Sequence, residues 1–259
     1  MSATELADAD SRARTPTARR LLLVWQDPDT RAFVPVGALT AEPDDSFTFR
    51  YLRRAERHDS FRPLASFPRL REIYRFVDLP PFFGNRVMSP RRPDYPDHLR
   101  ALSLTEDTAT PFEMLARTGG ARATDTFHVV AEPAVEADGL VRTRFLAHGV
   151  RHIDGAGQRI ERLSSGDRLR LRPDTANAVN PQALLVDAVA GEPVGWVPDW
   201  MLDTVRRLTA ADPSYDLTVD VANGPAAPAH LRLLCLLTAR VGTNGLLPRD
   251  PDLDYIAGA

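Results

Sequence analysis

Arginine is concentrated in one stretch of this 259-residue chain, and its spacing there favours contact with phosphate. Between Val141 and Arg172 there are eight arginines, at positions 142, 144, 151, 159, 162, 168, 170 and 172. Only three acids, Asp154, Glu161 and Asp167, share the stretch, which leaves a local excess of five positive charges. Such a stripe is typical of a surface that binds a nucleic-acid backbone. It is equally typical of a solvated sheet face, and both interpretations stay open.

A second arginine-rich section lies earlier in the chain and is interleaved with rings. Its members are Arg86, Arg91, Arg92, Tyr95, His98 and Arg100. Arginines between aromatic residues can bind single strands by charge and stacking. A surface loop has the same composition, so this section adds only a secondary hypothesis.

The sequence offers few groups for catalysis. His148 and His152 are four residues apart, but they flank Gly149 at the end of a predicted strand, where helical ligand spacing does not apply. Ser164 and Ser165 precede a turn, and no relay partner is identifiable. We therefore expect no enzyme activity, no catalytic residue, no metal and no cofactor. An uncharacterised hydrolase with a deep pocket of convergent His, Asp or Glu remains an alternative.

Composition limits the class of protein. The net charge of −3 excludes a globally basic nucleic-acid binder, and all 32 basic residues are arginine, which reduces the meaning of any single one. The lone cysteine, Cys235, lies in an apolar run and is predicted to be a buried thiol. No apolar run approaches the roughly 18 residues of a membrane span, so we expect a cytoplasmic protein. Residues 1–18 and 246–259 are predicted to be tails.

The N-terminal half has the pattern of a small mixed domain. Apolar and alternating runs predict strands at 21–25, 33–39, 47–51 and 126–132, and helices are expected at 80–88, 95–102 and 111–117. The last helix has clear boundaries: Thr110 and Glu113 form a capping box, and Gly119 can end it with a positive φ. A polar segment at 132–139 marks the best boundary, which gives domains at 19–135 and 140–245.

The C-terminal half is rich in predicted strands. These cover 142–150, 168–172, 183–190, a short strand ending at 197, 215–221 and 230–240, with one helix at 199–208. Turn signals every 8–12 residues are typical of a small barrel. The expected fold class is therefore α+β, a small mixed N-terminal domain followed by a β-barrel domain.

Two motifs in the N-terminal half resemble a known family. Phe82-Phe-Gly-Asn-Arg-Val-Met88 and Pro111-Phe-Glu-Met-Leu-Ala-Arg-Thr-Gly-Gly120 are similar to the N-terminal subdomain of HipA-type toxin kinases. The resemblance covers roughly residues 21–132 and implies a small α+β cap that contacts partner proteins. No kinase domain follows, because the chain has neither a glycine-rich phosphate loop nor a His-Arg-Asp catalytic loop. It therefore implies a scaffold role.

Three ordered motifs in the C-terminal half resemble the HIRAN domain. They are Leu163-Ser-Ser-Gly-Asp-Arg-Leu-Arg-Leu171, Asn177-Ala-Val-Asn-Pro-Gln-Ala183 and Val194-Gly-Trp-Val-Pro198, and Gly149-Val-Arg-His152 matches the family's opening motif. The resemblance covers roughly residues 143–240. It implies an OB-like barrel that binds single-stranded DNA, in some members by its free 3′ end.

The resemblance also implies which residues contact DNA. Arg151 matches the phosphate- or base-contacting arginine, His152 takes the place of a stacking aromatic, and Asn177 matches the loop asparagine. The chain departs from the family at Val179, where a stacking tyrosine is expected, and at Asn180, where an aspartate is expected. With the neighbouring strand residues, the predicted nucleic-acid-binding set is Arg151, His152, Arg170, Arg172, Asn177, Val179, Asn180 and Trp196.

The sequence therefore predicts a binding protein for single-stranded DNA or DNA ends. Its N-terminal domain would hold a protein partner such as a helicase, a nuclease or a component of a HipA-like system. The alternative is a protein–protein adaptor or toxin–antitoxin-type regulator that does not bind DNA.

Overall fold

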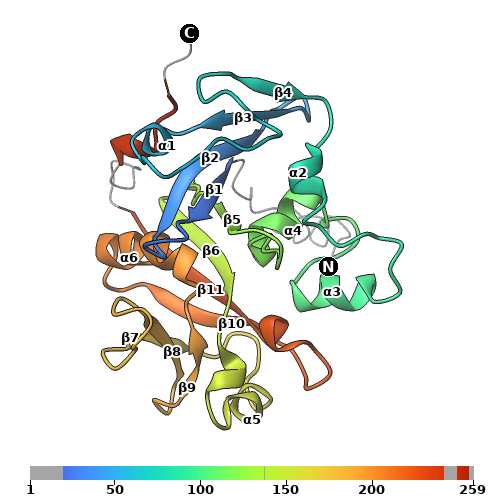
Figure 1. Cartoon of the computed structure of the whole chain (residues 1–259). Coiled ribbons are helices and arrows are strands. Elements are labelled where there is room, and N and C mark those ends of the chain that lie inside the picture. The colour runs from blue at the N-terminus through green and yellow to red at the C-terminus, as the bar shows by residue number, and fades with distance from the viewer. Residues whose placement is uncertain (1–19, 137, 242–249, 257–259) are drawn as a thin grey trace.

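The computed structural model of the chain describes residues 20–136, 138–241 and 250–256. The described residues form three antiparallel sheets with short helices between and beside them (Figure 1). The fold is thus mixed and rich in sheet, as the α+β prediction required. We refer to residues 20–136 as the N-terminal half and to the rest as the C-terminal half. The tail predicted at 1–18 lies outside the described residues.

Five strands of the N-terminal half form one sheet, in the order β4-β3-β2-β1-β5. They are β1 (Arg20–Gln26), β2 (Phe33–Ala41), β3 (Phe47–Tyr51), β4 (Tyr74–Phe76) and β5 (Phe127–Ala131). The interior of β1 is buried on both faces, which explains its unbroken apolar sequence. The predicted meander of three N-terminal strands is confirmed, and β5 pairs along the other side of β1.

Four short helices accompany this sheet: α1 (Arg53–Glu56), α2 (Pro81–Gly84), α3 (Tyr95–Ala101) and α4 (Pro111–Thr118). The predicted boundaries of α4 are confirmed. The Thr110 Oγ1 accepts a hydrogen bond from the Glu113 N–H at 3.1 Å, and Gly119 ends the helix at a φ of 73°. The helix predicted at 80–88 is too long, because α2 stops where Gly84 and Asn85, both poor helix formers, follow one another.

The C-terminal half contains two three-stranded sheets, in the orders β10-β11-β6 and β7-β8-β9. The strands are β6 (Leu140–Leu146), β7 (Leu169–Pro173), β8 (Leu184–Ala188), β9 (Pro193–Trp196), β10 (Asp216–Ala222) and β11 (Leu233–Arg240). The helices are η2 (Val150–His152), α5 (Ala156–Ile160), η3 (Asp199–Met201), α6 (Leu202–Ala211), η4 (Ala229–Leu231) and η5 (Pro251–Leu253). In Figure 1 the β7-β8-β9 sheet lies at the end of the molecule opposite β3 and β4.

Several predicted strands are longer than the observed ones, and in two of them the cause is clear. The strand predicted at 142–150 ends at Leu146, because Gly149 adopts a left-handed φ of 68° that turns the chain into η2. The strand predicted at 230–240 begins at Leu233, because η4 precedes it. Helix α5 could not be predicted, because it is too short to show a helical period in the sequence.

Two isolated bridges join the sheets of the C-terminal half. His148 and Trp196 exchange backbone hydrogen bonds of 2.8 and 2.9 Å, which connects the chain after β6 to β9. Near β7, the Gly166 N–H donates to the Val219 carbonyl at 2.8 Å, and the Val219 N–H donates to the Asp167 carbonyl at 2.9 Å. The described residues contain no closed barrel, so the predicted barrel stays a prediction.

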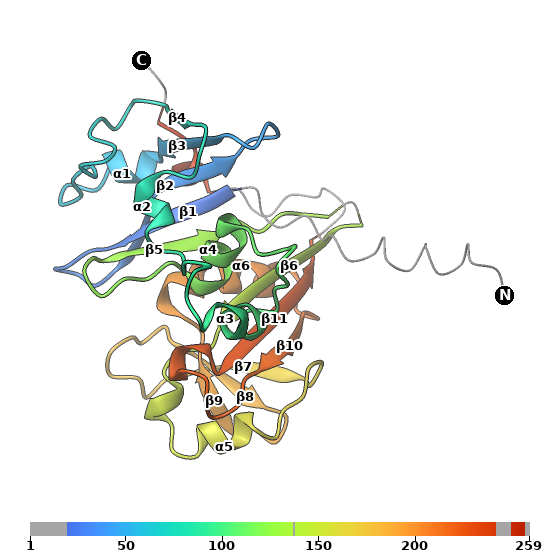
Figure 2. The same cartoon turned by 90° about the vertical axis from the view of Figure 1, so that its right-hand side faces the viewer.

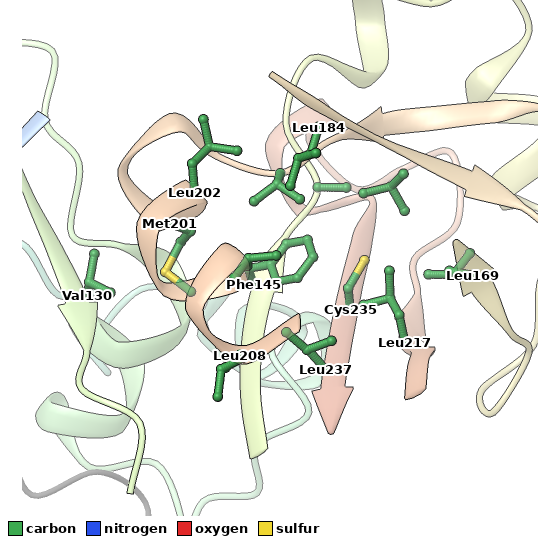
Figure 3. Close-up of a cluster of buried hydrophobic side chains, with 14 of the residues drawn as sticks. Val130, Phe145, Leu169, Leu184, Met201, Leu202, Leu208, Leu217, Cys235 and Leu237 are labelled. Atoms are coloured by element: carbon green, nitrogen blue, oxygen red, sulfur yellow. The ribbon is translucent and has the colours of Figure 1, made fainter. Parts of the chain in front are cut away.

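The largest hydrophobic cluster draws on both halves of the chain. Figure 3 shows Val130 of β5 on one side of α6 and Phe145 of β6 on the other, with Cys235 and Leu217 beyond. Leu22 of β1 belongs to the same cluster. The two predicted domains are therefore packed through a shared apolar interior, to which α6 contributes Leu202, Val205 and Leu208.

The C-terminal end returns to the N-terminal sheet. Residues 250–256 were predicted to belong to a tail, but Leu253 and Ile256 are buried. The Leu253 carbonyl accepts a hydrogen bond from Arg20 Nη2 at 2.9 Å, and Tyr255 bridges to Leu52. Residues 246–249 and 257–259 of that predicted tail lie outside the described residues.

Membrane-spanning helices were sought over the described ranges. None of the helices there is both long and apolar enough to cross a bilayer.

Candidate nucleic-acid interface

Trp196 holds the start of η2 against β9. Gly149 lies so close to the indole that a Cβ at this position would be 2.4 Å from Trp196 Cε3. The backbone bridge between His148 and Trp196 fixes the same two segments. Gly149 is thus required twice, for its positive φ and for its missing side chain. This contact places the start of η2, the helix that carries Arg151 and His152, next to Trp196.

Asp174 ties the polar loop to the same tryptophan. Its Oδ2 accepts hydrogen bonds from Trp196 Nε1 at 2.9 Å and from Asn177 Nδ2 at 3.0 Å. These bonds, first that of Trp196 and then that of Asn177, lower the pKa of the Asp174 carboxyl, so it is ionised at neutral pH. We call the surface formed by residues 149–152, residues 174–182 and Trp196 the Trp196 face.

Both asparagines of the loop are engaged in holding its shape. Asn177 Oδ1 accepts from the backbone N–H groups of Val179 and Asn180, at 3.0 and 2.9 Å. Asn180 Nδ2 donates to Asp199 Oδ1 at 2.7 Å, and its Oδ1 accepts from the Gln182 N–H at 2.9 Å. The loop is therefore preorganised, and it presents Val179, which is 92% exposed, at its surface.

Arg151 and His152 are both exposed on η2. Arg151 Nε donates a hydrogen bond to His152 Nε2 at 3.0 Å. In the described part of the chain, neither side chain has a carboxylate partner. Arg151 can therefore offer its terminal nitrogens to an anion.

Most of the arginine stripe is neutralised by acids from outside its own stretch. Five of the eight arginines form ion pairs with acids of other segments: Arg142 with Glu136, Arg144 with Asp220, Arg159 with Glu192, Arg168 with Asp216 and Arg172 with Asp187. Arg151, Arg162 and Arg170 have no such pair among the described residues, and all three are exposed. The free positive charge of this surface is therefore smaller than its sequence indicates.

Arg170 and Arg172 lie on the same strand but in different environments. Arg172 donates to both carboxylate oxygens of Asp187, at 2.6 and 3.1 Å, and the Asp187 side chain is only 5% exposed. The ion pair raises the pKa of the Arg172 guanidinium. Arg172 thus compensates a buried carboxylate, whereas Arg170 remains exposed on β7, in the same sheet as Trp196.

The second arginine-rich section is mostly structural. The Arg86 side chain is 1% exposed, and its Nη2 lies 2.6 Å from Asp125 Oδ2. Arg92 pairs with Asp94, and Arg100 pairs with Asp97. These three paired arginines therefore no longer support the hypothesis of single-strand binding, whereas Arg91, which is exposed, still does.

The residues considered for catalysis are not arranged as a relay. The Ser164 N–H donates to Asp167 Oδ2 at 2.7 Å, so this carboxylate caps a turn. Cys235 is buried, as predicted, and burial raises the pKa of its thiol, which disfavours the thiolate. Across the described ranges, no group of three or more His, Cys, Asp or Glu is placed to hold a metal ion.

Sequence reasoning missed an aromatic junction between the halves. The His128 ring of β5 stacks on Trp200 of η3, with centroids 3.9 Å apart and planes 14° from parallel. His148 meets the same indole edge-on at 4.6 Å. His128 and Trp200 are far apart in the sequence, so their contact could not be predicted from spacing. The tryptophan beside the helix start at Asp199 was the one feature of the sequence that could have indicated it. Sequence reasoning also missed Asp174, which directly precedes the loop.

The chain was compared with protein-family models, with characterised proteins and with solved structures, and none of the three comparisons gave a match.

Proposed function

We propose that the C-terminal half is an OB-like barrel of the HIRAN type that binds single-stranded DNA across the Trp196 face. The strand connections support this proposal. Through the two isolated bridges the strands follow the cyclic order β6-β9-β8-β7-β10-β11 and back to β6. Such an order suits a partly open barrel, because two of its six connections are single bridges and not full strand pairings.

The observation that carries the proposal is the position of Trp196. This one side chain contacts Gly149 at the start of η2 and Asp174 at the start of the loop. Segments that resemble separate family motifs therefore converge on one ring. This convergence of segments favours recognition of DNA. A tryptophan ring that is fixed in place can stack on a base, while accessible arginines neutralise phosphate.

Each predicted residue has a role in this proposal. Arg151 and Arg170 contact phosphate, while His152 and Trp196 supply planar surfaces. Asn177, Asn180 and Arg172 act indirectly, because their side chains hold the loop and strand that carry the contacting groups. Val179 occupies the loop surface without stacking.

The N-terminal half is proposed as the protein-contacting part. Its sheet ends at β4, a short edge strand that pairs only with β3 among the described strands. Val77 directly follows β4 and is 85% exposed. An edge with an apolar neighbour suits strand addition by a partner chain. A helicase, a nuclease or a HipA-like component is the proposed partner class.

The test is fluorescence polarisation with a short 5′-labelled single strand that has either a free or a phosphorylated 3′ end. We expect binding at low salt, a preference for the free 3′ end, and a loss of about tenfold for Arg151→Ala. Arg75→Ala on β4 is the matched control, because Arg75 is exposed and lies in the other half. No binding at low salt, or equal losses for the two variants, would overturn the proposal.

A specific observation favours a second function, a protein–protein adaptor without DNA binding. Five of the eight stripe arginines are paired, and Val179 presents an exposed apolar side chain where stacking would need a ring. The adaptor hypothesis predicts one stoichiometric protein in a pull-down, retained after nuclease treatment and lost with Val179→Asp. Retention of the partner by Val179→Asp would exclude this face as the adaptor surface.

A further inference from the structure

A cavity of about 640 Å³ lies where the two halves meet, separate from the Trp196 face. The N-terminal half contributes the end of α2, α3 and α4, and the C-terminal half contributes the end of β6 and η4. Figure 2 shows α3 and α4 on the side of the molecule along which β6 and β11 run. The volume is within the range of small-molecule binding sites.

The lining combines an apolar surface with basic groups. Met88, Met114, Leu146 and Leu231 are among its apolar members. The ionisable side chains that line it are His98, His148, His230, Arg86 and Arg122, and its lining includes neither Asp nor Glu. A cavity with this composition repels cations and accepts an anion that carries an apolar body.

Two nitrogens of the lining residues are buried without a hydrogen-bond partner. They are His98 Nδ1 and Arg86 Nε. Buried polar groups are almost always paired, and an unpaired one is costly. Asp125 already pairs with the terminal Nη2 of Arg86, so the unpaired Nε is a separate group. Because these two nitrogens are themselves buried, they show that these lining side chains are not fully hydrogen-bonded within the protein, and a ligand would contact other atoms of these side chains.

We propose that this cavity binds a small organic oxyanion, an apolar body that carries one carboxylate or phosphate group. Met114 and Leu231 contact the body, while His98, His230 and Arg122 meet the anionic group. Arg122 is exposed and has no ion pair among the described residues, so its charge is available. The proposal is independent of DNA binding, because none of these residues belongs to the Trp196 face.

Protonation of His98 should couple to binding. Burial, and next the charge of His230 from η4, lowers the pKa of the His98 imidazole. Asp94, the residue before α3, raises this pKa, and Arg92, two residues earlier in the chain, lowers it. An anion in the cavity would raise it, because the charged imidazole would gain a partner.

His148 behaves in the same way from the opposite wall. Burial is the main cause that lowers the pKa of its imidazole, Asp199 of η3 raises it, and His230 lowers it. Binding of an anion therefore takes up protons. The affinity should be about tenfold higher at about pH 6 than at about pH 8, where the free histidines are neutral.

Calorimetric titration of the full chain tests the proposal, with benzoate and phenyl phosphate as the two anionic probes. Benzyl alcohol supplies a similar body without charge. Benzoate keeps its charge throughout this pH range, so its pH dependence reports on the protein. We expect binding of one or both anions, tighter at the lower pH, and at least about tenfold weaker binding of benzyl alcohol.

Two exposed positions locate the binding site without threatening the fold. Arg122→Gln and His230→Gln should each weaken binding about tenfold, whereas Arg75→Gln, the matched control on β4, should leave it unchanged. No binding of either anion at about pH 6, equal binding of benzyl alcohol, or equal losses in all three variants would overturn the proposal.

Discussion

The Trp196 face and the cavity between the halves differ in how much of their sequence charge a ligand can reach. Around the Trp196 face the sequence is dense in arginine, yet most of these guanidiniums are paired with acids from other segments of the chain. The cavity draws its basic groups from scattered positions, from residue 86 to residue 230, with no acid in the lining. Local charge in a sequence is therefore a poor measure of charge that a ligand can reach.

Antiparallel pairing explains the first half of this difference. A strand places its neighbours' side chains within reach, so Asp187 of β8 neutralises Arg172 of the adjacent β7, and Asp220 of β10 reaches Arg144 of β6 across the intervening β11. The cavity has no such regular neighbour, because loop ends and helix ends form it. If the two regions differ in this way, substitutions at the Trp196 face and substitutions beside the cavity should change different measured properties.

The largest effect is expected at the glycine that forms the Trp196 face. Gly149→Ala should lower the free energy of unfolding by about 3 kcal/mol, because it adds a Cβ against the indole to the cost of a left-handed φ. Urea denaturation measures this change, and DNA binding should be lost with it.

Gly166→Ala is the matched control for this substitution. Gly166 has a φ of 89°, but no atom lies within 4 Å of the position a Cβ would take, so only the backbone cost of about 1 kcal/mol is expected. Equal destabilisation by the two alanines would mean that the contact between Gly149 and Trp196 does not hold the face together.

The next effect concerns the junction beside the cavity, and it appears as acid sensitivity. Burial, and then the charges of His148 and Arg86, lowers the pKa of His128 to about 4, below the 6.5 of an unfolded histidine. The unfolded state therefore takes up a proton first. Stability is complete above about pH 6.5 and falls as the pH drops to about 4, by roughly 2 kcal/mol after allowance for solvent screening.

Urea unfolding at several pH values between about 7 and 4 measures this loss. His128→Phe keeps a ring against Trp200 and should flatten the profile in that window. His152→Gln, at an exposed position of the Trp196 face, should leave the profile unchanged. A His128→Phe profile as steep as that of the wild type would show that the junction histidine is solvated.

The difference between the two regions also explains how far the sequence could predict this molecule. Strands and caps are local, so the meander from β1 to β3 and both ends of α4 were predictable from apolar spacing and from Thr110 and Gly119. The pairing of Arg172 with Asp187 depends on strand register, which spacing alone does not give. The contact of His128 with Trp200 joins residues of different halves. The features that could not be predicted from the sequence are therefore the contacts between residues that are distant along the chain.

A gain of function should distinguish DNA binding from an adaptor role at the Trp196 face. Val179→Tyr adds a ring at an exposed loop position, and stacking of one base should raise single-strand affinity about tenfold. Fluorescence polarisation measures the gain. Val189→Tyr is the control, since Val189 is also exposed but lies in the turn between β8 and β9, outside the face. Equal affinities of the two variants would count against DNA binding.

The smallest effect tests the comparison most directly, because it uses two arginines of one strand. Arg170→Gln should weaken single-strand binding about threefold and reduce the slope of log affinity against log salt by about 0.7, as expected for one lost phosphate contact. Arg172→Gln should leave that slope unchanged. It should instead lower the urea midpoint, because the buried Asp187 carboxylate loses its partner.

The two readouts together decide whether pairing controls availability. A salt slope that changes equally in both variants would mean that Arg172 leaves Asp187 to meet phosphate, so paired arginines would still count toward the basic surface. A slope that changes only with Arg170→Gln would mean that an ion pair with a buried acid removes an arginine from the binding surface. In that case the accessible charge of a sheet must be counted after its cross-strand pairs are subtracted.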